Sequence, residues 1–277
     1  MYATRKNRKH EIQIFGIPIH SPSRQEILEE IGRNIRRARE SARISITSSE
    51  LMYNARRIRF IPDYIRSCRY SLCDSMAVVL SALIRGVRVH RLTGPMLMEM
   101  CAEYGVERGW RHFFCGGAKG VAELLSERFS SRYSGFQTAG IFCPPFRKLS
   151  NEEEEDMIRC INSSNADILW VGLGVVKQEL WISQHIQALH IPWIVGVGGA
   201  FDYHAGTVRR APKWMRQIGM EWSYRLCTEP WRWKRISSSH LFMFESVLDA
   251  VFGRAPVFGG EQGAGIRIPE WKGNSSS

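Results

Sequence analysis

Residues 168–197 read ILWVGLGVVKQELWISQHIQALHIPWIVGV and hold two short apolar runs, at 168–171 and 193–197. A helical pattern spans 179–189 between them. Two strands that are joined through a helix lie parallel in one sheet, because the crossover returns the chain to the end where the first strand began. The segment therefore predicts a β-α-β unit.

The same alternation fills the part of the chain that precedes this segment. Apolar runs predict strands at 12–17, 44–47, 71–73, 112–115 and 136–141, and helical patterns lie at 25–39, 76–84, 121–128 and 152–161. Strands separated by helix-length segments favour a parallel sheet with helices on both faces. We predict an α/β fold with a doubly wound, Rossmann-like parallel sheet. In such sheets ligands bind beyond the carboxyl ends of the strands, so the loops at those ends are the candidate site.

The composition excludes several classes of protein. The 277 residues are 44% hydrophobic and 23% charged, which excludes a disordered chain. The longest apolar stretch, 191–201, is shorter than the roughly 20 residues of a membrane-spanning helix, and 11–18 is too short and polar for the core of a signal peptide. The seven cysteines never form a C-x-x-C pair, which favours reduced thiols over disulfides or zinc. We expect a cytoplasmic protein without a membrane span.

The C-terminal part of the chain is dense in cations and aromatic rings. The formal net charge of +11 implies a polyanionic neighbour: nucleic acid, an anionic membrane face or a phosphorylated substrate. Tryptophan and arginine together suit a membrane interface, and a solvated helix face is the alternative. We predict a catalytic domain at 11–206, a helical appendage for diphosphate and membrane contact at 207–254, and a disordered tail at 255–277. The cations and rings of 207–236 are Arg209, Arg210, Lys213, Arg216, Arg225, Arg232, Lys234, Arg235, Trp214, Trp222, Tyr224, Trp231 and Trp233.

One glycine-containing loop joins a predicted strand to a predicted helix. Gly116 and Gly117, with Gly120, precede a helix start, where backbone N–H groups and the helix dipole favour a phosphate. An ordinary tight turn between strand and helix is the alternative. The motif lacks the complete glycine pattern of a dinucleotide site, so both readings stay open.

A second such loop holds Gly172 and Gly174. The third position of the dinucleotide fingerprint is Lys177 instead of glycine, which disfavours a nicotinamide cofactor. Lys177, Gln178 and Glu179 begin the next helix and offer an ammonium, an amide and a carboxylate, a set that suits a hydroxyl-rich, phosphorylated ligand. The alternative is a solvated first helical turn in which Glu179 complements the helix dipole.

Asp74 ends an apolar strand, at a position where a buried carboxylate needs a partner or a chemical role. It is a candidate general base, and an N-cap of the helix that starts near Ser75 is the alternative. The chain contains no Asp-x-Asp and no His/Glu or Cys/His pair with metal spacing, so we expect neither a metal nor a cofactor. Arg91 and the arginines of 209–235 would neutralise a leaving diphosphate instead.

At these positions the chain resembles the WecG/TagA/CpsF family of glycosyltransferases. The resemblance extends over residues 14–236. Its clearest motifs are VGLGVVKQE at 171–179, VGGAFDYHAGTVRRAPKWM at 197–215 and MEWSYRLCTEPWR at 220–232, and weaker ones are TSS at 47–49, CDSM at 73–76, RLTG at 91–94 and FCGG at 114–117.

The resemblance implies an inverting, metal-independent transfer of a sugar, from a UDP-sugar donor to a polyprenyl-diphosphate-linked saccharide, in the synthesis of envelope polysaccharide or exopolysaccharide. It implies an enzyme that lies peripherally on the inner face of the cytoplasmic membrane, against an anionic membrane surface. Asp74 would be the base, and Thr47, Arg91 and Gln178 would line the same pocket. The expected substrate-binding residues are Thr47, Ser49, Arg91, Gly116, Gly117, Gly172, Gly174, Lys177, Gln178, Glu179, Asp202, Arg210, Arg225 and Arg232.

Four residues depart from the family's pattern, and they leave the donor sugar open. Ser49 replaces asparagine, Ser75 replaces glycine, Pro95 stands where an acidic residue often follows Thr-Gly, and Val176 replaces proline. A side chain at Ser75 would narrow the space beside Asp74. A nucleic-acid-binding protein and a nicotinamide oxidoreductase are the competing classes, and we expect no nucleic-acid partner. A homo-oligomer is left open.

Overall fold

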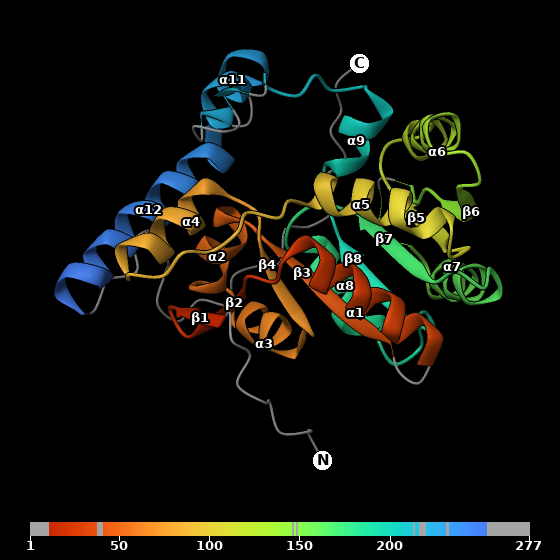
Figure 1. Ribbon diagram of the computed structural model, residues 1–277, viewed down its shortest axis with the longest axis horizontal. Coiled ribbons are helices and arrows are strands. Elements are labelled where there is room, and N and C mark those ends of the chain that lie inside the picture. Colours follow the sequence, from red (N-terminus) through yellow and green to blue (C-terminus); the bar gives the residue numbers. More distant parts are fainter. Residues whose placement is uncertain are drawn as a thin grey trace. The chain divides into compact units, whose positions relative to one another are not determined.

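The computed structural model describes residues 11–37, 41–145, 147, 149–212, 214–215, 220–230 and 233–253, without the side chains of 225, 234 and 235. The chain forms two compact units (Figure 1). Unit 1 comprises Met1–Glu29, Ile44–Thr93 and Arg210–Gly259, and unit 2 comprises Glu30–Arg43, Gly94–Arg209 and Gly260–Ser277. This is a division by compactness, so the predicted division by role into 11–206 and 207–254 stays a prediction. The predicted tail, 255–277, lies outside the described residues.

The strands of unit 1 include an antiparallel hairpin that the sequence did not predict. β1 (Glu11–Ile14) pairs antiparallel with β2 (Ile17–His20), so the single strand predicted at 12–17 is wrong. Phe15 and Gly16 between them have φ of 52° and 70°. Two successive residues at positive φ make the tight turn whose twist suits a two-residue hairpin. The chain therefore reverses in the middle of the apolar run.

The other strands of unit 1 are parallel. β2 pairs with β4 (Tyr70–Cys73), and β4 pairs with β3 (Ala42–Thr47), which gives the order β1-β2-β4-β3. In register, Thr47 lies opposite Cys73. The carboxyl ends of β3 and β4 thus lie side by side.

The described residues of unit 1 contain five helices besides the start of α1. They are α2 (Ser49–Ala55), α3 (Phe60–Ser67), α4 (Met76–Ile84), α11 (Glu221–Thr228) and α12 (Trp233–Phe252). The bounds of α4 match the prediction, whereas α2 and α3 were not predicted, since each has only about two turns in which to show a period. α1 (Arg24–Arg37) continues from unit 1 into unit 2.

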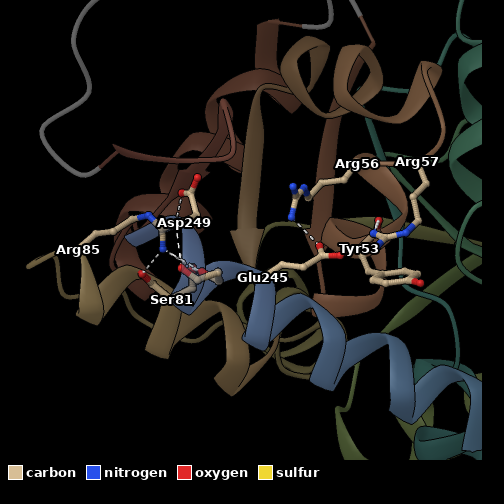
Figure 2. Close-up of polar contacts among 8 residues, drawn as sticks. Tyr53, Arg56, Arg57, Ser81, Arg85, Glu245 and Asp249 are labelled. Carbon is tan, nitrogen blue, oxygen red and sulfur yellow. Dashed lines mark hydrogen bonds and ion pairs between the residues drawn. The ribbon is translucent and has the colours of Figure 1, made fainter. Parts of the chain in front are cut away.

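The long C-terminal helix α12 packs against α2 and α4 through buried polar contacts (Figure 2). Glu245, which is fully buried, accepts hydrogen bonds from Arg56, at 2.6 Å, and from Arg57. Arg85, the C-cap of α4, donates to Asp249 at 2.5 Å. The described residues of the predicted C-terminal appendage thus include two helices, α11 and α12, and α12 is bonded to the α/β part of unit 1.

Unit 2 is a second parallel array, with the order β8-β7-β5-β6. Its strands are β5 (Arg111–Gly116), β6 (Gln137–Phe142), β7 (Ile168–Gly172) and β8 (Trp193–Gly196), and its helices are α5 (Gly94–Val106), α6 (Val121–Arg132), α7 (Asn151–Ser163), α8 (Lys177–His185) and α9 (Ala200–Ala205). The predicted elements from residue 112 to 197 are present, although α8 begins and ends earlier than expected. The β-α-β unit at 168–197 is confirmed.

A buried histidine lies in the core of unit 2. His112 stacks on Phe136 and Trp170, and its Nδ1 accepts a hydrogen bond from Trp170 Nε1 at 3.0 Å. Burial lowers the pKa of His112 to about 3, so the ring is neutral at physiological pH. It serves as a packing residue.

The fold is therefore α/β and Rossmann-like, with mostly parallel strands, as predicted. Among the described strands, β1 pairs in the antiparallel sense. In the described part of the chain, no helix combines the length and the apolar character that crossing a membrane requires.

Candidate functional site

Asp74 lies directly after β4, at the carboxyl end of a parallel strand in unit 1. Its N–H donates to the carbonyl of Thr47 at 3.2 Å, and the residue is half-buried. The N-cap of α4 is Ser75, whose hydroxyl accepts from the N–H of Val78. The capping role proposed as the alternative for Asp74 thus belongs to its neighbour, and Asp74 stays the candidate base.

Arg91 places a cation at this strand end. Its Nε donates to the carbonyl oxygen of Asp74 at 2.7 Å, and its Nη2 lies 3.2 Å from a carboxylate oxygen of Glu221 in α11. Burial first, and the Asp74 carboxylate second, raise the pKa of the Cys73 thiol to about 12, while Arg91 acts in the opposite direction. Cys73 therefore stays protonated. The charges of Asp74 and Arg91 both influence the pKa of its thiol, in opposite directions.

Ser49 and Ser75, which both depart from the family's pattern, bond to each other. The N–H of Ser49 donates to the Ser75 hydroxyl at 3.1 Å, and the Ser49 hydroxyl donates to Ser239 of α12 at 2.8 Å. Ser75 thus directs its side chain toward the start of α2 as well as toward α4. The two loops beside Asp74 are joined to the C-terminal helix by hydroxyl groups.

Thr47 is fully buried at the end of β3. Its hydroxyl lies 2.8 Å from that of Ser71 and 3.0 Å from that of Ser45. The N–H of Ser71 in turn donates to Nδ1 of His20 at 2.9 Å. These contacts favour a packing role for the Thr47 side chain, and its contact with substrate stays a prediction.

The predicted arginines of the C-terminal segment differ in how far the structure describes them. Arg210, in unit 1, donates to the Thr93 hydroxyl at 3.5 Å. Arg225 lies in α11, but its side chain is outside the described residues, as is the whole of Arg232. Their contact with a diphosphate stays a prediction.

In unit 2, close packing of the backbone accounts for two of the predicted glycines. A Cβ at Gly116 would lie 2.7 Å from the carbonyl group of Gly172, and a Cβ at Gly172 would lie 3.0 Å from the Phe201 ring. The N–H of Gly117 donates to the carbonyl of Gly172 at 3.1 Å. These contacts support the tight-turn reading of Gly116 and Gly117. Gly174 has open space around it, and phosphate contact stays a prediction for all four.

Gln178 and Glu179 are buried at the start of α8, so the solvated-turn reading is wrong for both. Glu179 accepts from the N–H of Val176 at 2.5 Å and from Gln178 Nε2 at 2.8 Å. Gln178 Oε1 accepts from the N–H of Gly198 at 2.9 Å. The pair thereby ties the loop after β7 to the loop after β8. Lys177 beside them is half-buried.

Val176 is a strained residue that sequence reasoning noted only as a departure from the family. Its φ is 74°, a value that β-branched residues rarely adopt. Strain of this kind persists where the surroundings enforce it and is often found at binding loops. The hydrogen bond to Glu179 is one such constraint, and a proline at this position could not donate it.

Asp202 lies in the short helix α9 and holds the chain that follows it. Its carbonyl accepts from the N–H of Val208 at 3.3 Å, and its carboxylate accepts from the Thr207 hydroxyl at 3.3 Å. These local bonds give Asp202 a structural role at the end of α9, and its contact with substrate stays a prediction.

The structure brings Asp74, Arg91 and Ser49 together in unit 1, and the two glycine loops with Gln178 and Glu179 in unit 2. The expected common pocket of Thr47 and Arg91 with Gln178 stays a prediction. Sequence reasoning missed Glu221 and Ser239 as partners of this site. Among the residues with described positions, no group of His, Cys, Asp and Glu could hold a metal ion.

Comparison with known proteins adds a family and named relatives. The model of one protein family, described as "Glycosyl transferase WecG/TagA/CpsF family", matches residues 12–255. A protein of Bacillus subtilis strain 168, named N-acetylglucosaminyldiphosphoundecaprenol N-acetyl-beta-D-mannosaminyltransferase, is 29% identical over 196 residues, 70% of this chain and 75% of that protein.

Proteins with the same name occur in other bacteria. That of Bacillus spizizenii is 31% identical over 175 residues, 63% of this chain and 66% of that protein. That of Staphylococcus aureus strain NCTC 8325 is 28% identical over 184 residues, which cover 66% of this chain and 70% of that protein. Because the family match covers most of the sequence, the chain is a glycosyltransferase that belongs to the WecG/TagA/CpsF family.

Proposed function

We propose that this glycosyltransferase moves a sugar from a UDP-sugar to a polyprenyl-diphosphate-linked saccharide, with inversion and without a metal ion. The observation that carries the proposal is Asp74, a half-buried carboxylate at the carboxyl end of a parallel strand that leaves the helix cap to Ser75. The acceptor class follows the first part of the name shared by the relatives, N-acetylglucosaminyldiphosphoundecaprenol, which is a lipid-linked saccharide.

In the proposed reaction the Asp74 carboxylate takes the proton of an acceptor hydroxyl group. The oxygen then attacks the anomeric carbon of the donor as the bond from that carbon to the diphosphate oxygen breaks. The products are UDP, the elongated lipid-linked saccharide and a protonated Asp74, which returns its proton to water. A single displacement inverts the configuration of the anomeric carbon.

Cationic side chains take the place of a metal ion at the leaving diphosphate. Arg91 and Arg210, with Arg225 and Arg232, are the candidates, because guanidinium groups bind phosphate oxygens in a fixed, bidentate geometry. Lys177, Gln178 and Glu179 are assigned to the donor, with Gln178 and Glu179 shaping the loop and Lys177 offering the charge.

The donor sugar is left unnamed because the residues beside Asp74 depart from the family's pattern. The hydrogen bonds among Ser49, Ser75 and Ser239 depend on hydroxyl groups at positions 49 and 75, where the family's pattern has an asparagine and a glycine. We therefore propose a sugar or acceptor that differs from the common N-acetylmannosamine transfers.

We place the enzyme peripherally on the inner face of the cytoplasmic membrane. Exposed aromatic rings in the C-terminal segment support this location: Trp214 is 59% exposed, Trp233 57% and Phe252 73%. Rings of this kind insert at headgroup depth while neighbouring arginines meet anionic lipid.

The test is transfer from a panel of radiolabelled UDP-sugars into organic-extractable lipid, on membranes that carry short lipid-linked glycans, with EDTA present. Label in the lipid phase from one donor supports the proposal and names the sugar. Label that appears only when a divalent metal is restored contradicts the metal-independent mechanism. Nanomolar, salt-sensitive binding of RNA or DNA without any transfer would favour the nucleic-acid alternative.

Neutralising Arg225 and Arg232 together should weaken binding of UDP or of anionic liposomes. Each charged contact that is desolvated on binding contributes about 1.5–3 kcal/mol, so the double variant should lose affinity by at least about tenfold. Titration with UDP and co-sedimentation with liposomes measure the two losses. The matched control neutralises Arg132 and Arg159, whose side chains in unit 2 are 62% and 75% exposed. Equal binding by both variants would remove the appendage from the mechanism.

A further inference from the structure

The Arg91 side chain is held between two groups that the proposed reaction does not use. Its Nε donates to the Asp74 carbonyl at 2.7 Å, and its Nη2 meets the Glu221 carboxylate at 3.2 Å. The side chains of Arg91 and Glu221 are only 22% and 16% exposed. A pair so shielded from water has a stronger field than a surface pair.

The position of Arg91 creates a conflict for a general base. A cation close to a carboxylate stabilises its charged form and so weakens it as a proton acceptor. Arg91 is bonded to the main chain of Asp74 itself, and its charge reaches the neighbouring thiol of Cys73. An uncompensated Arg91 would therefore favour diphosphate binding at the expense of proton transfer.

Glu221 supplies an opposing charge from α11, 130 residues further along the chain. Other described groups near this strand end include the Cys73 thiol on β4, the hydroxyl groups of Ser49 and Ser75, and Arg210 at Thr93. Cys73 is uncharged, since its thiol stays protonated, and the serines carry no charge. Glu221 is thus a carboxylate placed to offset the charge of Arg91.

We propose that Glu221 is a positioning residue that holds Arg91 on the Asp74 carbonyl and offsets its charge, so that Asp74 keeps the basicity its reaction requires. The inference rests on the proposed role of Asp74 as the base. It assigns to the Met-Glu-Trp motif at 220–222 an electrostatic task in addition to any docking of the appendage.

Glu221→Gln keeps the shape of the side chain and removes its charge. With the negative charge of Glu221 removed, the charged form of Asp74 is favoured more strongly, so its pKa should fall by about half a unit. A lower pKa moves the acid limb of the kcat profile to lower pH by the same amount. Glu221→Asp keeps the charge and should restore both values.

The pKa is measured by carbon-13 NMR of aspartate carboxyl groups in the full chain, with Asp74→Asn identifying the Asp74 resonance. Asp249→Asn is the matched control, because it also removes a carboxylate paired with an arginine in unit 1. Its partner Arg85 caps the far end of α4, whereas Asp74 precedes the N-cap Ser75. The helix separates them by roughly 15 Å, which exceeds the Debye length at physiological salt. This control should leave the pKa of Asp74 unchanged.

An unchanged pKa in Glu221→Gln overturns the inference, because a residue that only docks α11 would leave the proton equilibrium of Asp74 alone. This readout requires no turnover, so it stands even if the proposed reaction fails. A pKa that falls while the acid limb stays in place overturns Asp74 as the base and with it the proposed mechanism.

Discussion

Asp74→Asn should lower turnover about a hundredfold to ten-thousandfold, because an amide cannot accept the proton of the acceptor hydroxyl. Binding of UDP should be largely retained, since the substitution preserves the size of the side chain. Helix α4 should also be retained, because its N-cap is the hydroxyl of Ser75. The measurement is lipid-extractable product from the donor that the panel identifies, beside a UDP titration of the same preparation.

The control for Asp74→Asn is Asp63→Asn, in α3 of the same unit, whose side chain is 81% exposed. Its turnover should equal that of the unchanged protein. Full turnover by Asp74→Asn would show that another group, or water itself, takes the proton. Loss of UDP binding together with turnover would instead assign Asp74 to the donor site.

Glu245→Gln should destabilise unit 1 by about 3–5 kcal/mol, the cost of leaving buried charges without their partner. Glu245 is fully buried on α12, and the side chains of Arg56 and Arg57 are only 10% and 5% exposed. Arg57 also lies 3.4 Å from the centre of the Tyr53 ring, and Arg56 lies 4.2 Å from that of Phe15. Figure 2 shows Glu245 facing the arginines from the adjacent helix. The guanidinium groups cannot turn to water without disrupting these contacts.

Urea-induced unfolding, followed by tryptophan fluorescence and circular dichroism, measures this loss. Asp249→Asn removes the neighbouring carboxylate, which pairs with Arg85 but is 26% exposed, and should cost about 1 kcal/mol or less. Glu155→Gln on the exposed surface of α7 should have no effect. Equal midpoints for Glu245→Gln and Glu155→Gln would show that the charge of Glu245 contributes nothing to stability.

The position of the candidate base was open to prediction because it depends on local pattern. The short apolar run before Asp74 marks the end of a strand, and the carboxyl ends of parallel strands form the ligand-binding edge of α/β sheets. What local pattern could not decide is whether Asp74 or Ser75 caps α4. Both residue types are good N-caps, and only the backbone geometry selects the serine.

The helix start at Lys177 illustrates the same limit. A polar triplet at a first helical turn is usually solvated, so the burial of Gln178 and Glu179 ran against the pattern. Their partners are the N–H groups of Val176 and Gly198, and the second belongs to the loop after another strand. Buried polar groups need hydrogen-bond partners. Here one partner is supplied by the loop after a neighbouring strand, which the local sequence pattern does not reveal.

The sequence alone determined the α/β class, the parallel crossover at 168–197, the strand-end aspartate and the family. These depend on residue periods and motifs within one segment. The tertiary structure decided the β1–β2 hairpin, the burial of Gln178 and Glu179, the seating of α12 through Glu245, and the pairing of Arg91 with Glu221. Glu245 and Arg57 are 188 residues apart, and Arg91 and Glu221 are 130 apart. Contacts over such separations leave no periodic trace in the chain, because they form only when packed elements bring distant residues together.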